Sequence, residues 1–308
     1  MTNRDFHDPR ATEQRNPRSE RIDVASSLEI VDIMNAEDAR VAGVVQGQRE
    51  QIARAIDLIV AAFKAGGRLV YVGAGTSGRL GVLDATECPP TFGVPPTMVT
   101  GVIAGGYPAL VKSAEGAEDD VNAGMVAMDT AQVTNRDVVV GIAASGTTPY
   151  VRAALGKAQT LGATTVLLTC AMPPKVLAET CDVIINPVVG PEVVTGSTRL
   201  KAGTATKLVL NTLSTGAMIR LGKVFGNLMV DLMALSAKLH DRGERIVMEV
   251  GGVSRDEARQ AIERAKGSVK LAIVMARRKV DAAEARRLLE TADGFVRPVV
   301  GDPPPVGR

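Results

Sequence analysis

The sequence predicts an α/β protein built on a three-layer, doubly wound parallel sheet. Short runs rich in Val, Ile and Thr alternate with longer segments in which apolar residues recur at helical spacing. The short runs are continuously apolar rather than alternating, as expected for parallel strands that helices cover on both faces. Ligands of such sheets bind beyond the carboxyl ends of the strands, so the loops after the strands are the expected site.

The individual elements follow from these patterns. Strands are expected at 69–73, 97–103, 137–143, 164–169 and 182–186. Helices are expected at 28–34, 38–63, 78–86, 107–128, 147–162 and 197–221, with Pro89 and Pro90 ending the third of them. Beyond Gly226 the strand signal ends, and helices are expected at 228–241, after the N-cap Ser254, at 268–279 and at 281–292.

Three parts are expected along the chain. Residues 1–25 are charged, polar and proline-containing, which predicts a flexible tail or extended arm. Residues 26–245 form the sheet domain with its flanking helices. Residues 246–308 form a small helical domain whose proline-rich end is loose.

Composition narrows the classes of function. The 308 residues are 45% hydrophobic and 23% charged, with a net charge of +2, no Trp and 3% aromatics, so no nucleic-acid partner is expected. No apolar run approaches the roughly 18 residues of a membrane span, and no hydrophobic signal segment is seen. Three cysteines without metal-ligand spacing predict reduced thiols. We therefore expect a cytoplasmic protein with no membrane partner, no metal and no cofactor.

A glycine and hydroxyl loop follows the first predicted strand. It reads Gly73-Ala74-Gly75-Thr76-Ser77-Gly78 and opens a helix. Glycines allow close backbone approach, Thr76 and Ser77 add hydroxyl donors, and the helix start offers free N–H groups, which together predict a phosphate site. The loop lacks the Lys of a Walker motif, and its formal Gly-x-Gly-x-x-Gly match has no well-placed acidic partner, which favours a small phosphorylated ligand.

A second cluster of the same kind, with Ser145, Gly146 and Thr147, follows the 137–143 run. Two such loops at one sheet edge predict a sugar-phosphate pocket; N-capping of the next helix is the alternative. The acidic candidates near these loops are Glu87, Glu115, Glu118 and Glu192, since a tuned carboxyl can move protons on a sugar. Lys201 and Lys207 either face a substrate carboxylate or lie on an exposed helix face.

Several motifs together resemble one enzyme family. They are GAGTSGRLGVLDATECPPTFGV, IAGG, EGAEDD, GIAASGTTPYV and the long segment from VVGPEVVTGSTRL to GNLMVD. In this order they resemble the N-acetylmuramic acid 6-phosphate etherases, which belong to the sugar isomerase (SIS) fold group and are similar to the glucokinase regulatory protein. The resemblance runs from about Leu28 to Val296.

The resemblance implies a cofactor-free lyase of amino-sugar catabolism and peptidoglycan recycling. We expect it to be a homodimer, because the apolar stripes of the long helices predicted at 38–63 and 197–221 exceed what one sheet can cover. Such an enzyme cleaves the D-lactyl ether of N-acetylmuramic acid 6-phosphate by elimination and rehydration, giving N-acetylglucosamine 6-phosphate and D-lactate. Its catalytic carboxyls match Glu87 and Glu118, the latter rather than Glu115. It also implies that Thr76, Ser77, Ser145 and Thr147 hold the phosphate. Together with Gly78, Gly146 and Glu192, these are the expected substrate-binding residues. Thr147 stands where the family often carries Arg, and His240 is a candidate for opening the sugar ring.

The length of the first loop's helix raises a question about Glu87. This residue follows the helix start by about ten residues, so a continuous helix would carry it roughly 15 Å away. Either Glu87 curls back from a short helix, or it serves the phosphate site of a neighbouring subunit. Two other functions stay open: an aldose–ketose isomerase using Glu192 or Glu118, and a sugar-phosphate sensor without turnover. Lactate release separates the etherase from both.

Overall fold

The computed structural model describes residues 10–232 and 237–305, which divide into two compact units. The first unit comprises Met1–Thr86 and Thr97–Ser214, and the second comprises Glu87–Pro96 and Thr215–Arg308. Among the described residues, no helix is long and apolar enough to cross a membrane.

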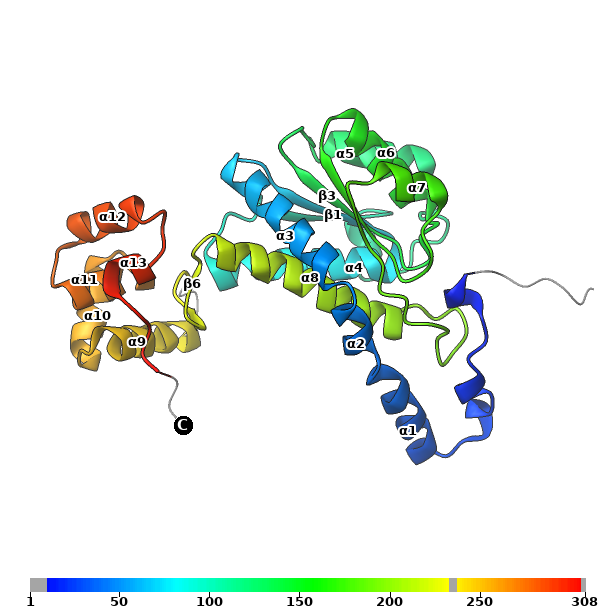
Figure 1. Cartoon of the computed structure of the whole chain (residues 1–308), viewed down its shortest axis with the longest axis horizontal. Helices are drawn as coiled ribbons and strands as arrows, with labels where there is room; N and C mark the ends of the chain where they lie inside the picture. Colours follow the sequence, from blue (N-terminus) through cyan, green and yellow to red (C-terminus); the bar gives the residue numbers. More distant parts are fainter. Residues whose placement is uncertain (1–9, 233–236, 306–308) are drawn as a thin grey trace, which may run out of the picture. The chain divides into compact units, whose positions relative to one another are not determined.

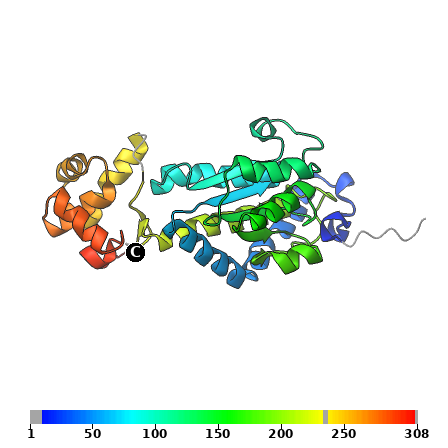
Figure 2. The ribbon, with the colours of Figure 1, turned by 90° about the horizontal axis from the view of Figure 1, so that it is seen from above.

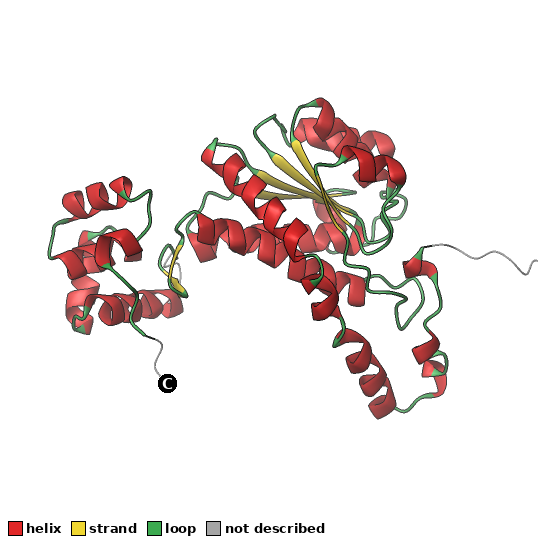
Figure 3. Cartoon of the chain, viewed as in Figure 1, coloured by secondary structure: helices red, strands yellow, loops and turns green. Residues whose placement is uncertain are grey.

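The first unit is organised around a five-stranded parallel sheet, drawn in yellow in Figure 3. Its strands are β1 (Leu69–Gly73), β2 (Val99–Ile103), β3 (Val138–Ile142), β4 (Thr164–Leu168) and β5 (Val183–Ile185). Their order is β2-β1-β3-β4-β5, which confirms the predicted α/β class and all five predicted strands. The chain runs from β1 to β2 on one side of β1 and then crosses to β3 on its other side, so the switch point lies between β1 and β3.

Helices cover both faces of this sheet. One face carries α5 (Val121–Thr130), α6 (Pro149–Thr160) and α7 (Lys175–Thr180), and the other carries α3 (Arg49–Lys64), α4 (Gly75–Phe92) and α8 (Lys201–Arg220) (Figure 1). Strand residues alternate between the two cores: Val70 and Val72 pack on the α5–α7 side, whereas Tyr71 faces α4.

A buried polar network joins β1, α4 and α8. The Tyr71 hydroxyl donates to Asp84 Oδ2 at 2.8 Å, and the Ser214 hydroxyl donates to Asp84 Oδ1 at 3.1 Å. Burial raises the pKa of Asp84, and the two hydroxyl bonds oppose that rise. The network fixes α4, whose first turn forms part of the site, against its neighbours.

The N-terminal segment differs from the expected flexible tail over its described part. Residues 10–25 contain three 3₁₀ helices, η1 (Ala11–Glu13), η2 (Pro17–Ser19) and η3 (Ile22–Val24). Gly196 N donates to Thr12 O at 3.2 Å, and the Ser19 hydroxyl donates to Val193 O at 2.8 Å, so the segment lies along the loop before α8 (Figures 1 and 2). Helices α1 (Ser27–Asp38) and α2 (Val41–Gln46) follow it.

Helix α4 is longer than predicted, because Pro89 and Pro90 do not end it. Both prolines lie in its last turns, where their fixed φ is compatible with a helix although each lacks an N–H and crowds the carbonyl four residues earlier. Gly93 N still donates to Pro89 O at 2.9 Å. The prediction that the helix stops before Pro89 is therefore wrong. The alternative in which Glu87 curls back from a short helix is wrong as well.

The helix predicted at 107–128 is also wrong as a single element. A 3₁₀ helix, η4 (Tyr107–Leu110), is separated from α5 by a loop over 111–120. Gly116 has φ +74° within that loop, and Asp120 caps α5 by accepting from Ala123 N at 2.8 Å. This loop carries Glu115 and Glu118.

The second unit contains a two-stranded hairpin, β6 (Val224–Phe225) and β7 (Leu228–Met229), where a helix from 228 was predicted. Gly226, at φ +58°, makes the turn. Part of the predicted helix, residues 233–236, lies outside the described residues; its end falls in α9 (Ala237–Gly251). The predicted N-cap Ser254 is confirmed and forms a capping box with Glu257. The remaining helices are α10 (Arg255–Arg264), α11 (Val269–Arg278), α12 (Ala282–Thr291) and α13 (Arg297–Val300).

Candidate active site

The first hydroxyl loop connects β1 to α4, and the end of β1 lies very close to the first turn of α4. A Cβ atom on Gly78 would lie 2.7 Å from Gly73 O and 2.6 Å from Ile103 Cγ1, and Gly75 has φ +53°. Only glycines allow the strand end and the first helical turn to approach in this way. Thr76 and Ser77 lie in the first turn of α4, where backbone N–H groups of a helix lack intrahelical partners.

The second hydroxyl loop connects β3 to α6. Gly146 has φ +73°, and its N–H donates to Ala143 O at 2.8 Å. The Ser145 and Thr147 hydroxyl oxygens lie 3.0 Å apart, and Thr147 N donates to Ser145 Oγ at 3.3 Å. The N-cap residue of α6 is Thr148, which makes no side-chain cap hydrogen bond. The hydroxyls of this loop therefore do not cap α6, which favours the binding interpretation.

The two loops line one cavity of about 380 Å³, which we call the cradle cavity. It brings together Thr76, Ser77, Ser145 and Thr147 with Glu118, as the sequence predicted for a shared pocket. Gly78 and Gly146 are buried and contribute through the backbone shape of the loops. The cradle cavity lies at the β1–β3 switch point, where sheets of this order bind their ligands.

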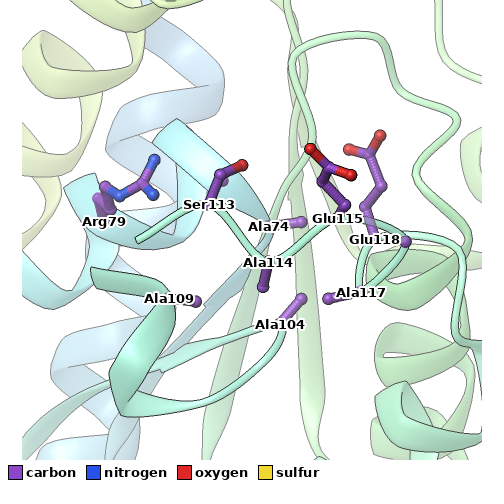
Figure 4. Close-up of a pocket in the computed structure, with 11 residues that line it drawn as sticks. Ala74, Arg79, Ala104, Ala109, Ser113, Ala114, Glu115, Ala117 and Glu118 are labelled. Atoms are coloured by element: carbon purple, nitrogen blue, oxygen red, sulfur yellow. The ribbon is translucent and has the colours of Figure 1, made fainter. Parts of the chain in front are cut away.

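A second cavity of about 270 Å³, which we call the alanine cavity, shares Ala74, Gly75 and Glu118 with the first. Figure 4 shows the carboxylates of Glu115 and Glu118 side by side above the alanine methyl groups. Tyr150 N donates to Glu118 O at 2.9 Å, which anchors the loop to the start of α6. Glu118 lines both cavities, whereas Glu115 lines only the alanine cavity. A group that spans the two cavities would pass Glu118.

Glu192 occupies a structural position. Its side chain is buried and accepts from Lys201 N at 3.0 Å and from Ala202 N at 2.9 Å, so both oxygens cap the first turn of α8. Burial raises its pKa, and these two backbone bonds oppose the rise. It does not line the cradle cavity or the alanine cavity, and a role in substrate binding stays a prediction without geometric support.

The remaining candidates lie on helices outside the two hydroxyl loops. Glu87 is exposed on α4, twelve residues after Gly75, and belongs to the second unit. His240 is exposed on α9 in the same unit. Lys201 is buried and paired with Glu37, so it does not lie on an exposed helix face, whereas Lys207 does.

Several lining residues escaped the sequence-based prediction. Arg10 and Glu13 reach the cradle cavity from the N-terminal segment, and Arg79 and Ser113 line the alanine cavity. Arg10 and Glu13 lie in a stretch without periodicity, and nothing local indicates that it packs against the loop before α8. Arg79 was detectable, since it follows Gly78 directly in the first turn of the phosphate-site helix.

The sheet order and the two hydroxyl loops define an α/β protein of the SIS class. In agreement, the model of the glucokinase regulatory protein N-terminal SIS domain matches residues 51–159. N-Acetylmuramic acid 6-phosphate etherase of Edwardsiella ictaluri (strain 93-146) is 52% identical over 295 residues, which cover 96% of this chain and 98% of that one. N-Acetylmuramic acid 6-phosphate etherase 2 of Vibrio parahaemolyticus is 53% identical over 286 residues, covering 93% and 95%. The chain belongs to the N-acetylmuramic acid 6-phosphate etherase family.

Solved structures resemble the chain more distantly. Phosphoheptose isomerase GmhA from Neisseria gonorrhoeae shares 18% identity with a TM-score of 0.46, covering 62% of this chain and 98% of its own.

Proposed function

We propose that this protein is a carbon–oxygen lyase that cleaves the D-lactyl ether of N-acetylmuramic acid 6-phosphate. The products are N-acetylglucosamine 6-phosphate and D-lactate, which places the reaction in amino-sugar catabolism and peptidoglycan recycling. The observation that carries the proposal is the cradle cavity, where two hydroxyl loops and Glu118 meet at the switch point of the sheet. Relatives that bear this activity in their names align over nearly the whole chain.

The chemistry requires proton transfer at two neighbouring carbons. The ether oxygen on C3 is a poor leaving group, but in the open-chain sugar it is β to the aldehyde. Removal of the C2 proton and departure of the lactyl oxygen, which takes up a proton, leave a C2–C3 double bond conjugated with the aldehyde. Water then adds its oxygen to C3, and C2 regains a proton. Each half needs one base and one acid, so two carboxyl groups suffice.

In this proposal the position of each residue determines whether it binds the phosphate or acts at the reacting carbons. Thr76, Ser77, Ser145 and Thr147 hold the phosphate with the N–H groups of the α4 start, because hydroxyls and helix N-termini bind anions. Glu118, on the wall shared by the two cavities, acts at the C2–C3 bond. Thr147 donates a hydroxyl bond where an Arg in relatives would add charge.

Glu87 is proposed as the second carboxyl, supplied to the site of a neighbouring copy in a homodimer. Its continuous helix supports this, because twelve residues correspond to about 18 Å of helix rise from Gly75. Glu87 is exposed one turn after Leu83, an apolar side chain that is 46% exposed. A further apolar groove, lined by Val45, Ile52 and Leu208, offers surface for a second copy.

We also propose that the enzyme works in the cytoplasm. None of Cys88, Cys170 and Cys181, all within the described residues, forms a disulfide. Burial raises the pKa of the Cys170 thiol to about 12, which makes it an unreactive core residue. Such thiols suit a reducing compartment.

The direct test replaces Glu118 and follows D-lactate released from N-acetylmuramic acid 6-phosphate. Glu118→Gln should lower kcat by 10²-fold or more, because the amide neither takes nor gives the proton. Glu115→Gln makes the same change three residues earlier and should keep at least about a tenth of the rate. Equal losses in the two variants, or none in Glu118→Gln, would contradict the role given to Glu118.

A further inference from the structure

The alanine cavity has an unusual lining of small methyl groups. Ala74, Ala104, Ala109, Ala114 and Ala117 all border it, and Ala104 and Ala109 are buried. A Cβ on Gly105 would lie 2.7 Å from Ala114 Cβ and 3.3 Å from Ala109 Cβ, so the loop after β2 folds tightly onto itself. The loop thus builds a small apolar wall directly beside the reacting region.

Polar groups stand at the rim of this wall. Arg79 Nε donates to Leu110 O at 3.0 Å, which fixes the guanidinium on the cavity side of α4. Across the residues that the structure describes, no carboxylate lies in ion-pair range of Arg79, so its remaining N–H groups are available to a ligand. Figure 4 shows Arg79 and Ser113 on one side of the cavity and Glu115 and Glu118 on the other.

The position of Glu118 between the two cavities indicates which part of a bound sugar would enter the alanine cavity. If the phosphate lies in the cradle cavity and C2 and C3 lie at Glu118, the alanine cavity receives a substituent of C2 or C3. The C3 substituent is an anionic lactyl group, whereas the C2 acetamido group is neutral. Two carboxylates and one guanidinium line the alanine cavity, so a further carboxylate would meet net repulsion there.

We infer that the alanine cavity is the binding site for the 2-acetamido group of the sugar phosphate. The alanine methyls pack against the acetyl methyl, and the acetyl oxygen accepts a hydrogen bond from Arg79 or from the Ser113 hydroxyl. This inference rests on the proposed function for the placement of the sugar. It assigns to Arg79 a role in selecting N-acetylated sugars rather than in the elimination itself.

Two product-like ligands isolate the acetamido group in a binding experiment. N-Acetylglucosamine 6-phosphate carries it, and glucose 6-phosphate carries a neutral hydroxyl in its place. Calorimetry on the full chain should show that the first binds at least about tenfold more tightly, as expected when a buried methyl and a hydrogen bond are gained.

Two variants then remove the selection by different routes. Arg79→Met deletes the donor, and Ala114→Leu enlarges an exposed side chain that borders the cavity. Each should weaken binding of N-acetylglucosamine 6-phosphate about tenfold and change glucose 6-phosphate affinity less than twofold. Lys112→Met, which removes an exposed cation from the same loop outside the cavity, should change neither affinity.

Three outcomes would overturn the inference. Equal affinity of the wild-type protein for both ligands would show that no acetamido site exists. Equal weakening of both ligands by Arg79→Met would make Arg79 a phosphate ligand or a purely structural residue. Inhibition by D-lactate that Arg79→Met abolishes, with N-acetylglucosamine 6-phosphate binding intact, would assign the cavity to the lactyl group. Because these measurements need no turnover, absence of lactate release would contradict the proposed function alone.

Discussion

At the scale of single residues, the shape of the cradle depends on glycines rather than on the hydroxyls that they position. The hydroxyl residues themselves were predictable, because Thr76, Ser77, Ser145 and Thr147 follow recognisable strands in a recognisable pattern. The other residues that line the cavities were harder to predict from the sequence. Arg10 enters from a segment distant in sequence, and its position depends on tertiary hydrogen bonds that no local pattern encodes.

Gly78→Ala tests the close approach of β1 and α4. The added methyl would overlap Gly73 O and Ile103 Cγ1, so we expect a loss of about 1–3 kcal/mol in the free energy of unfolding and weaker phosphosugar binding. Gly156→Ala, in helix α6, is the matched control. Its Cβ meets nothing within 4 Å, so we expect it to stabilise the protein by about 0.5–1 kcal/mol. Urea unfolding and calorimetry measure both effects; equal stability of the two variants would contradict the steric account.

At the scale of elements, a buried carboxylate holds the N-terminal segment to the sheet domain. Glu37, on α1, accepts hydrogen bonds from Asn16 Nδ2 and from Arg18 Nη1, each at 2.9 Å, and pairs with the buried Lys201 at the start of α8. Burial alone would raise the pKa of Glu37. The bonds from Lys201 and Asn16 outweigh it and lower the pKa to about 2.

This arrangement predicts a specific pH dependence. Because the pKa of Glu37 is lower in the folded chain than its ordinary value of 4.5, its stabilising effect is complete above that value and is lost as the pH falls towards about 2. The free-energy difference between wild type and Glu37→Gln, measured by urea unfolding, should therefore shrink between pH 5 and pH 3. Glu20→Gln, which changes an exposed carboxyl in the N-terminal segment, should show a small difference throughout. A Glu37→Gln difference that does not vary with pH would contradict this explanation.

Strands were easier to predict than helix ends. All five parallel strands are short runs of mostly apolar and β-branched residues, and β1 and β3 are buried along their whole length. Helical periodicity was misleading between 107 and 128, where a loop with Gly116 at positive φ carries Glu118 into the site. Pro89 and Pro90 misled in the opposite direction, because α4 continues through both of them and ends only at Phe92. Local patterns thus failed in the 111–120 loop and in the last turns of α4, the two segments that carry Glu118 and Glu87.

At the scale of the whole molecule, the homodimer proposal can be tested by mixing two inactive variants. One variant lacks the Glu87 carboxylate and the other lacks a hydroxyl of the phosphate site. Glu87→Gln and Ser77→Ala each inactivate a site by a different route. If Glu87 serves the neighbouring copy, a mixed dimer contains one site with both defects and one site with none. Refolding the two inactive variants together should then restore about a quarter of the wild-type rate, since half of the dimers are mixed and each has one intact site. No recovered activity, with mixed dimers demonstrated, would place Glu87 in its own subunit's site or outside the reaction.

The central claim is that the phosphate cradle holds a sugar whose C2 proton is removed so that lactate can leave. It is tested most directly by incubating the wild-type protein with N-acetylmuramic acid 6-phosphate in heavy water. Lactate and the isotope content of the amino sugar are then measured together. We predict one D-lactate for each N-acetylglucosamine 6-phosphate formed, with solvent deuterium at C2. Lactate release without deuterium at C2 would contradict the elimination, and the absence of lactate would contradict the assigned activity.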